Sequence, residues 1–394
     1  MKNILFDLTS TQPIRDSKFH GGGRKTVIEY ITSLADGGAE TLVKDYALLI
    51  DKEKFNIIIA IKRPCEASAN YKILKEKNVH IEVLQNGKFF SKLLNKILKE
   101  KFYSLKLYKL IKKEMPSVIH IHLGILNNLI PISKKLKKVK LFYTCHNEPK
   151  QFFSSENCQE FLAAKKLIKE NNLQLIALHS KMSDELNKIF NIRNTIIIKN
   201  GVDFNRFKEL PETKEEIRKS INIPYNAFVL GHIGRFTQQK NHEYLVSIFE
   251  EVSKINKNAY LLLIGKGELK NHIKNILEQK KLLNKTIMLE NRTDIPRLLK
   301  AMDIFVFPSF YEGFGNVIVE AQISDIPCVV SDSIPSDVIL SKKVKCLSIE
   351  APANEWANII LNPEKILSTN YGNINNYDMN NVIKHLEEIY SSDF

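Results

Sequence analysis

Short apolar runs alternate with helical patterns along most of the chain, and this alternation limits the fold more than any other feature. Strand-length runs rich in β-branched residues lie at 117–124, 139–146, 173–179 and 195–201, and again at 228–234, 259–265, 285–290, 303–309 and 326–332. Such runs, bounded by turn signals, predict strands. Strands separated by helices form βαβ units, so the class is α/β with parallel sheets.

The length and the turn signals predict two domains. A chain of 394 residues is too long for one ordinary core and suits two doubly wound, Rossmann-like domains. Asn200-Gly201 is a turn signal, and Pro211 and a charged run follow it. We therefore expect a first domain over 1–202, a second over 203–375, and a terminal helix over 376–394 that packs on the first domain. Two such domains facing each other form a cleft that binds ligands at the carboxyl ends of the strands.

One helix between the strands of the second half has a clear apolar face. In NHEYLVSIFEEVSKI, apolar residues recur at helical spacing and predict a helix that covers one face of the sheet: Leu245, Ile248, Phe249, Val252 and Ile255.

The N-terminus allows two interpretations, because it contains two glycine turns. In one, 3–8 is the first strand and RKTVIEYITSLA is a helix. In the other, 26–31 is the strand, Asp36-Gly37-Gly38 is the turn, and TLVKDYALLID is the helix that leads to FNIIIAIK. We favour the second, because its spacing is compact and leaves no long loop without structure.

The positive charge lies in the first half of the chain. Residues 1–200 hold 35 Lys and Arg against 19 Asp and Glu, whereas residues 201–394 hold 23 against 25. Much of the excess lies in 88–114 and 133–140. Residues 88–114 have apolar residues at helical spacing with lysines between them, which is typical of a helix that binds anionic lipid headgroups. A solvated face of a lysine-rich helix explains the pattern equally well.

Two segments of the second half carry residues suited to a diphosphate. In GHIGRFTQQKNH, Arg235 follows a predicted strand and Lys240 precedes the next helix, so both cations are expected in the cleft. In PSFYEGFGNVIVEA, Glu312 lies in a loop after a strand, and the residues from Asn316 begin a helix. The glycines allow backbone amides to approach a ligand, and the helix N-terminus favours negative charge.

Glu312 and Glu320 are separated by a distance that suits a sugar nucleotide. They are eight residues apart, which in a helix corresponds to roughly 12 Å. The ribose diol and the hexose of a nucleotide sugar lie on either side of a pyrophosphate, at a similar separation. Either glutamate alone is explained as well by a surface ion pair, but their combination with Arg235 and Lys240 is not.

Six stretches of the chain, in their order along the sequence, resemble the family 4 retaining glycosyltransferases. These enzymes have the GT-B fold of two facing Rossmann-like domains. The resemblance covers roughly residues 25 to 390 and is closest to members that build bacterial capsule and exopolysaccharide. The stretches are DGGAETLV, TCHNEP, KNGVDFNRF, GRFTQQKN, LLIGKGEL and DIPRLLKAMDIFVFPSFYEGFGNVIVEAQ.

The resemblance implies a role for each residue of the predicted site. Arg235 and Lys240 neutralise the donor diphosphate, Glu320 holds the ribose hydroxyls, and His146 faces the transferred sugar. Gly37 and Gly38 close over the pyrophosphate, with Gly22 as the alternative donor loop. Arg292 and Thr293 lie where the family binds the base. Glu312 and the loop after it hold the sugar: Gly313, Phe314, Gly315, Asn316 and Val317.

No metal or other cofactor is expected. We place His120 and His122 on opposite faces of their strand, where they would not share a metal, and no Asp-x-Asp motif accompanies them. The five cysteines are scattered without CxxC spacing, which favours reduced thiols.

The predicted activity is transfer of a hexose from a UDP-sugar, with retention, to a glycan or lipid-diphosphate-linked oligosaccharide of a surface polysaccharide. A UDP-sugar epimerase of the same fold is the alternative, and a basic nucleic-acid-binding protein is a weaker one. The N-terminus lacks the features of a signal peptide, so we expect a cytoplasmic protein. The basic segments 88–113 and 133–140 leave peripheral binding to the inner face of the plasma membrane open.

Overall fold

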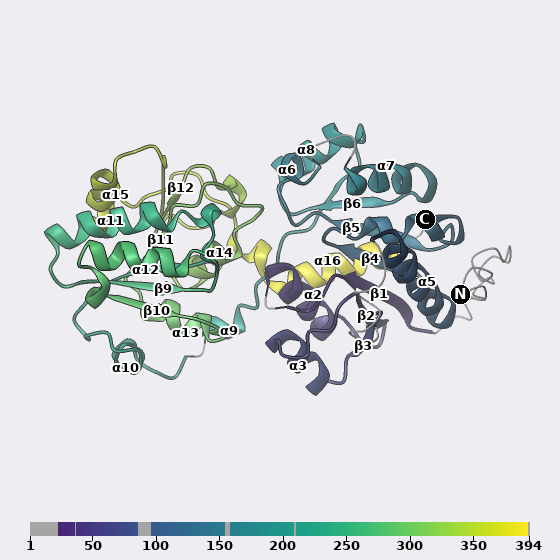
Figure 1. Cartoon of the computed structure of the whole chain (residues 1–394), viewed down its shortest axis with the longest axis horizontal. Helices are drawn as coiled ribbons and strands as arrows, with labels where there is room; N and C mark the ends of the chain where they lie inside the picture. The colour runs from purple at the N-terminus through teal and green to yellow at the C-terminus, as the bar shows by residue number, and fades with distance from the viewer. Residues whose placement is uncertain (1–22, 36, 86–95, 154–157, 209, 393–394) are drawn as a thin grey trace. The chain divides into compact units, whose positions relative to one another are not determined.

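The computed structural model describes residues 23–35, 37–85, 96–153, 158–208 and 210–392. The chain divides into two compact units (Figure 1). Unit 1 comprises residues 1–199 and 380–394, and unit 2 comprises residues 200–379. The sequence-based boundaries at 202/203 and 375/376 therefore differ by a few residues from the divisions at 199/200 and 379/380.

Unit 1 is built on a parallel sheet of seven strands among the described residues, in the order β3-β2-β1-β4-β5-β6-β7. The order turns back between β1 and β4, which are neighbours at the centre of the sheet. The strands are β1 (Lys25–Ile31), β2 (Phe55–Ile61), β3 (His80–Val83), β4 (Val118–His122), β5 (Lys140–Thr144), β6 (Gln174–Ala177) and β7 (Ile196–Ile197).

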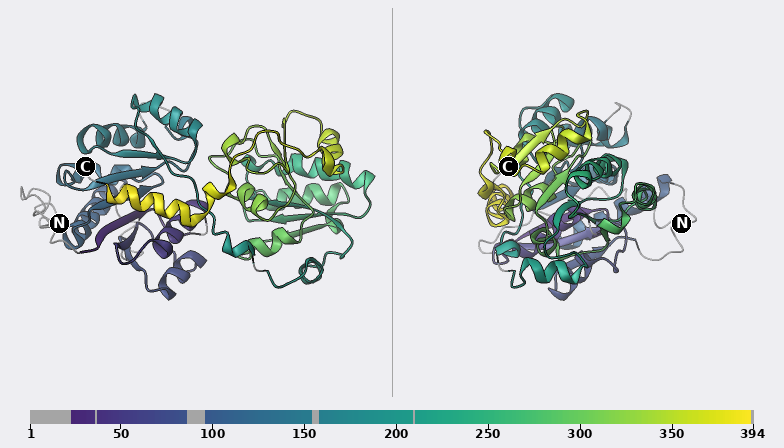
Figure 2. Two further views of the ribbon diagram at one scale, coloured as in Figure 1. Left: turned by 180° about the vertical axis from the view of Figure 1, so that it is seen from behind. Right: turned by 90° about the vertical axis from the view of Figure 1, so that its left-hand side faces the viewer.

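Helices connect these strands. The α-helices of unit 1 are α2 (Gly38–Leu49), α3 (Ala69–Glu76), α5 (Lys96–Glu114), α6 (Pro149–Phe152), α7 (Gln159–Asn171) and α8 (Ser180–Phe190), with 3₁₀ turns η2 (Leu126–Asn128) and η3 (Ile130–Lys135). Helix α16 (Met379–Ser391) also belongs to unit 1, apart from its first residue. Figures 1 and 2 show this helix, in yellow, lying against the sheet of unit 1.

The structure confirms the favoured interpretation of the N-terminus. Residues 25–31 form the central strand β1, and α2 and β2 follow at the expected places. The alternative helix over RKTVIEYITSLA is wrong, because Val27 to Ile31 are completely buried between β2 and β4. The alternative first strand at 3–8 and Gly22 lie outside the described residues.

Helix α5 covers residues 96–114 of the basic segment that the sequence suggests for membranes, and residues 88–95 of that segment lie outside the described residues. Its apolar side chains, including Leu107, Leu110 and Ile111, are buried within unit 1, whereas Lys109 and Lys112 are exposed. Lys109 and Lys112 are therefore exposed to solvent, whereas the described apolar side chains of α5 are not. None of the described helices combines the length and the hydropathy needed to cross a bilayer.

Unit 2 contains a parallel sheet of six strands in the described chain, in the order β10-β9-β8-β11-β12-β13. Here the order turns back between the central neighbours β8 and β11. The strands are β8 (Phe228–Ile233), β9 (Ala259–Ile264), β10 (Thr286–Leu289), β11 (Ile304–Phe307), β12 (Cys328–Ser331) and β13 (Val344–Leu347).

Helices of unit 2 bury the core against this sheet. They are α9 (Asn205–Lys208), α10 (Lys214–Ser220), α11 (His242–Ile255), α12 (Lys270–Gln279), α13 (Ile295–Lys300), α14 (Asn316–Ile323) and α15 (Ala353–Ile360), with 3₁₀ turns η4 (Gln238–Lys240), η5 (Leu283–Lys285), η6 (Ser336–Val338), η7 (Pro363–Lys365) and η8 (Ile374–Tyr377). Figure 1 shows α11 and α12 across one face of the sheet. Leu245, Ile248, Phe249 and Val252 are buried in this core as predicted, but Ile255 is 70% exposed because the helix ends there.

Candidate active site

The predicted cations and carboxylates of unit 2 follow its two central strands. The loop after β8 carries Arg235 and Lys240, and the loop after β11 carries Glu312. Because β8 and β11 are parallel neighbours, both loops leave the sheet at the same edge. The strand order turns back at this point, which is where open α/β sheets bind ligands.

Lys240 and Glu312 form an ion pair at this edge. Lys240 Nζ lies 2.6 Å from Glu312 Oε1, and the carboxylate residue is only 7% exposed. The same ammonium lies 4.7 Å from the centre of the Phe307 ring. A charge-assisted hydrogen bond and an aromatic face together fix the position of the cation.

The two loops are also joined through Gln239. Its backbone carbonyl accepts a hydrogen bond from Phe310 N at 2.9 Å, and its side-chain Nε2 donates to Tyr311 O at 2.8 Å. Arg235 is exposed near the start of the same loop. The structure therefore brings Arg235, Lys240 and Glu312 to one edge of the sheet, as the sequence predicts.

The loop from Gly313 to Val317 runs into α14. Gly315 is the N-cap, with φ of 93°, a conformation that favours glycine. Phe314 is buried and packs against Tyr377, with ring centres 5.6 Å apart. Asn316 accepts a hydrogen bond from Asn200 Nδ2 at 2.9 Å. Glu320 lies on α14, partly exposed, on the helix that begins at these amides.

Arg292 and Thr293 belong to the loop after β10. The Arg292 guanidinium donates to Asp294 Oδ1 at 2.7 Å, and this pairing raises the pKa of Arg292. Thr293 O accepts from Arg206 Nη2 at 3.3 Å. Asp294 thus partly neutralises the charge of Arg292, as Glu312 does that of Lys240.

In unit 1, the predicted residues lie at the carboxyl edge of the other sheet. Gly37 is the N-cap of α2, after β1, and Gly38 is the first helical residue. A Cβ at Gly37 would lie 2.3 Å from Glu40 Oε2, so the Glu40 carboxylate lies over this turn. His146 follows β5, and burial and the neighbouring His122 lower its pKa well below the usual range.

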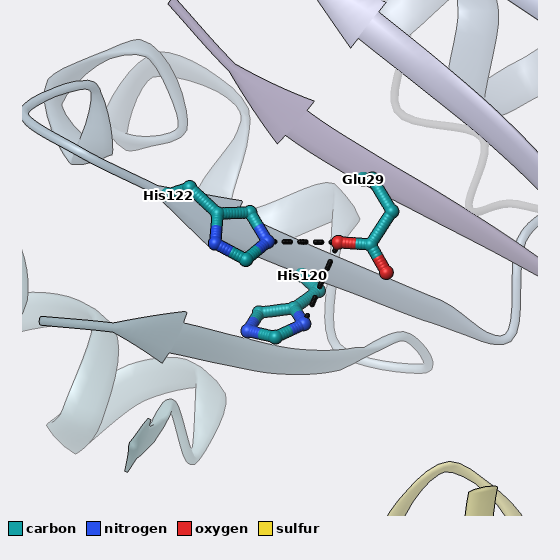
Figure 3. A group of neighbouring side chains, drawn as sticks. All are labelled: Glu29, His120 and His122. Atoms are coloured by element: carbon teal, nitrogen blue, oxygen red, sulfur yellow. Dashed lines mark hydrogen bonds and ion pairs between the residues drawn. The ribbon is translucent and has the colours of Figure 1, made fainter. Parts of the chain in front are cut away.

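A buried polar cluster next to His146 was not predicted (Figure 3). Glu29 on β1 and His120 and His122 on β4 are completely buried. His122 Nε2 lies 2.8 Å from Glu29 Oε2, and the two histidine rings are 4.1 Å apart between centres. The placement of these histidines on opposite faces is therefore wrong, because residues two apart on a strand share one face. That spacing, with a glutamate inside a neighbouring apolar strand, was the signal available in the sequence.

Among the described residues, the side chains of this cluster are also the ones placed closely enough to hold a metal ion together. One ligand atom from each of Glu29, His120 and His122 lies within 4.8 Å of the others. However, both ring nitrogens of each histidine already have hydrogen-bond partners. His120 contacts Tyr390 Oη at 2.6 Å and Thr144 Oγ1 at 2.7 Å, and His122 contacts Glu29 and His146. The geometry is that of a closed hydrogen-bond network, and burial lowers the pKa of His120 well below its usual range.

Comparison with known proteins identifies the family. Residues 36–206 match the model described as Glycosyltransferase Family 4, and residues 213–368 match Glycosyl transferases group 1. Together the two models span most of the chain and fit the two units in order.

Curated relatives and solved structures agree with these models. Putative glycosyltransferase EpsF of Bacillus subtilis is 26% identical over 86% of this chain and 87% of its own. The UDP-Gal:alpha-D-GlcNAc-diphosphoundecaprenol alpha-1,3-galactosyltransferase of Escherichia coli is 27% identical over 74% of this chain and 79% of its own. The crystal structure of Anabaena HepE with UDP and glucose superposes with a TM-score of 0.74, at 20% identity, over 93% of this chain and 99% of that chain.

The matches decide between the sequence-based alternatives. They confirm the predicted GT-B class with its two parallel-sheet domains, and they do not support an epimerase. The chain therefore belongs to the glycosyltransferases, with a family 4 region followed by a group 1 region.

Proposed function

We propose that the protein transfers a hexose from a UDP-sugar, with retention of anomeric configuration, to a glycan or lipid-diphosphate-linked oligosaccharide during surface polysaccharide synthesis. The observation that carries this proposal is the pairing of Lys240, from the loop that also carries Arg235, with the buried Glu312 at the carboxyl ends of β8 and β11. The names of relatives support the substrate class: the Escherichia coli relative uses UDP-Gal, and CapH of Staphylococcus aureus serves capsular polysaccharide biosynthesis.

The donor diphosphate is assigned to Arg235, Lys240 and the amides that precede α14. Cations and fixed N–H groups stabilise the charge that develops on the leaving nucleoside diphosphate. Glu312, held by Lys240, accepts hydrogen bonds from hydroxyls of the transferred sugar, and Glu320 accepts them from the ribose. The loop of Arg292 and Thr293 is assigned to the base.

Three residues of unit 1 complete the assignment. Gly37 and Gly38 offer backbone amides to the diphosphate, at the start of a 12-residue helix. His146 contacts the transferred sugar. The reaction is proposed to need no metal, because these cations and amides supply the positive charge.

A transfer assay with anomeric analysis tests this function. The purified protein is incubated with a panel of UDP-hexoses and an undecaprenyl-diphosphate-linked monosaccharide, and the product is examined by NMR. We expect a new α-linked disaccharide from an α-configured donor, unchanged by EDTA. A β-linked product would overturn retention, and epimerised donor without transfer would overturn the transferase assignment.

We further propose a cytoplasmic protein that binds the inner face of the plasma membrane peripherally, through the lysines of 88–113 and 133–140. Because the apolar face of α5 is buried, this contact is electrostatic rather than by insertion. Each lysine near an anionic surface contributes about 1 kcal/mol. Co-sedimentation should therefore show binding to vesicles with phosphatidylglycerol that weakens with salt and with K109Q/K112Q. Equal binding to neutral vesicles would contradict this proposal.

A further inference from the structure

A continuous line of hydrogen bonds connects the buried carboxylate of Glu29 to His146. His122 Nε2 lies 2.8 Å from Glu29 Oε2, and His122 Nδ1 lies 3.0 Å from His146 Nε2. Glu29 and His122 are completely buried, whereas His146 is partly exposed. The line therefore leads from the interior of unit 1 to a residue of the proposed site.

The sheet and the last helix hold the buried end in place. Glu29 on β1 lies opposite His120 on β4 in the strand register. The carboxylate of Glu29 and the imidazoles of His120 and His122 therefore lie on the same face of the sheet. Tyr390, from α16, donates its hydroxyl proton to Glu29 Oε1 at 2.8 Å. Both carboxylate oxygens are thus occupied as acceptors, one by Tyr390 and the other by His122.

These contacts determine where the protons lie. A carboxylate can only accept, so His122 must donate from Nε2. A neutral His122 then has its lone pair on Nδ1, which accepts a hydrogen bond from His146 Nε2–H. A neutral His146 protonated at Nε2 has its lone pair on Nδ1, and this nitrogen has no hydrogen-bond partner among the described residues.

We propose that Glu29 and His122 are positioning residues that hold His146 as the Nε2–H tautomer, so that Nδ1 accepts a hydrogen bond from a hydroxyl of the sugar substrate. The placement of His146 beside the sugar rests on the proposed function, but its tautomer does not. Hydrogen bonding of the far ring nitrogen is the usual way in which proteins select a histidine tautomer. The lowered pKa of His146 agrees with a neutral ring.

Nitrogen NMR of the intact protein labelled with ¹⁵N-histidine tests the tautomer. The signals of His146 and His122 are assigned through the backbone resonances of the unaltered protein, and their loss in His146→Ala and His122→Phe checks the assignment. We expect one-bond N–H correlations, protected from exchange with water, at Nε2 of both residues. In His122→Phe the His146 Nε2–H should exchange rapidly, whereas the matched control His179→Phe, also buried in unit 1, should leave it protected.

Two results of this experiment would overturn the proposal. The first is a proton at Nδ1 of His146 in the unaltered protein, which would mean that His122 donates to it as a cation. The second is a bound metal that shifts the signals of His120 and His122 when EDTA removes it. Both measurements use the unaltered protein, so they remain decisive even where a variant does not fold.

A double-mutant cycle tests the consequence for transfer. Changing the partner that orients a metal-bound histidine typically lowers activity 10- to 100-fold, and we expect a loss of about that size in kcat for His122→Phe. Because His122 acts through His146, the double variant with His146→Ala should be no slower than His146→Ala alone. Multiplying losses would show independent roles. If no variant and no unaltered protein transfers sugar, the proposed function fails while the NMR result still decides the tautomer.

Discussion

Lys240 Nζ and Glu312 Oε1 are 2.6 Å apart, although 72 positions separate them in the sequence. The pair exists because β8 and β11 are parallel neighbours, whose carboxyl ends present both loops at one edge of the sheet. Glu312 is nearly inaccessible to water, so its carboxylate depends on this partner. The pair thus holds an ammonium group and a carboxylate side by side. A nucleotide-sugar substrate needs both, the ammonium for its diphosphate and the carboxylate for its sugar hydroxyls.

Lys240→Ala should lower kcat/KM by about 100-fold or more, because one lost stabilising group of this kind costs about 3 kcal/mol of transition-state stabilisation. It should also lower the thermal midpoint, since it leaves a buried carboxylate without its cation. Steady-state kinetics and calorimetry measure both effects.

The matched control is Lys343→Ala. Lys343 forms an equally short pair with Asp325, at 2.6 Å, but that pair is on the surface. Exposed pairs contribute at most about 1 kcal/mol, so this variant should keep its activity and nearly all its stability. Equal losses in the two variants would remove the special role of Lys240.

Gly265→Ala should disturb the loop that carries Arg235. Gly265 has φ of 154°, and a Cβ there would lie 2.0 Å from Gly234 O, the backbone just before Arg235. The strand end or the loop must therefore move, and we expect a destabilisation of about 1–3 kcal/mol. Trp356, the single tryptophan, is buried in unit 2, so its fluorescence reports the unfolding of this unit.

Gly372→Ala is the control for this substitution. It is exposed, and the nearest atom to its added Cβ is a leucine methyl at 3.2 Å, which can shift. Unfolding of Gly265→Ala at the denaturant concentration of the unaltered protein would contradict the predicted clash.

Glu160 should make stability fall as the pH rises. Burial raises its pKa from 4.5 to about 7, despite hydrogen bonds from Leu126 N and Asn127. The pKa of Glu160 is higher in the folded state than in the unfolded state. The contribution of Glu160 to the free energy of unfolding is therefore complete below pH 4.5 and is lost as the pH rises through 7. Each pKa unit corresponds to about 1.4 kcal/mol.

Glu160→Gln should therefore gain stability relative to the unaltered protein between pH 4.5 and pH 8. Urea unfolding followed by circular dichroism at several pH values measures the difference. Glu364→Gln, at an exposed position, should show no such trend. Parallel pH profiles for Glu160→Gln and the unaltered protein would show that the folded carboxyl ionises normally.

His242 should have the opposite effect, at acid pH. Burial, and then the charge of Lys240, lower its pKa from 6.5 to about 4. The contribution of His242 to the free energy of unfolding is therefore present above pH 6.5 and is lost as the pH falls through 4. His242 stacks on Phe236 with ring centres 4.3 Å apart, so phenylalanine is an acceptable replacement.

His242→Phe should reduce the loss of stability between pH 6.5 and pH 4, as measured by Trp356 fluorescence during urea unfolding. His272→Phe is the control, because His272 is exposed and pairs with Glu243 at 2.9 Å. An unchanged acid limb in His242→Phe would mean that the ring is not buried as a neutral group.

The strands of both sheets could largely be predicted because buried parallel strands are continuous apolar runs. All nine predicted runs contain strands of the structure. The strands β3 and β13 were missed. β3 reads HIEV and β13 reads VKCL, and each lies at or near an edge, where polar residues interrupt the pattern.

The site was predictable where a motif lies within one loop, but not where it depends on pairing between strands. Arg235, Lys240 and Glu312 occupy the expected edge. The link between Glu29 and His122 depends on β1 lying beside β4, and 93 positions separate the two residues. Likewise, periodicity gave α5 an apolar face but could not show that unit 1 itself covers that face.

Ligand-dependent unfolding of unit 2 can be compared between the unaltered protein and Lys240→Ala. Trp356 fluorescence is followed during urea unfolding with and without UDP-hexoses. At 100 times its Kd, a bound donor should stabilise the unaltered protein by about 2.7 kcal/mol, and Lys240→Ala much less at the same concentration. Equal stabilisation of both proteins, or stabilisation of neither by any UDP-hexose tested, would contradict a donor site at Lys240 and Glu312.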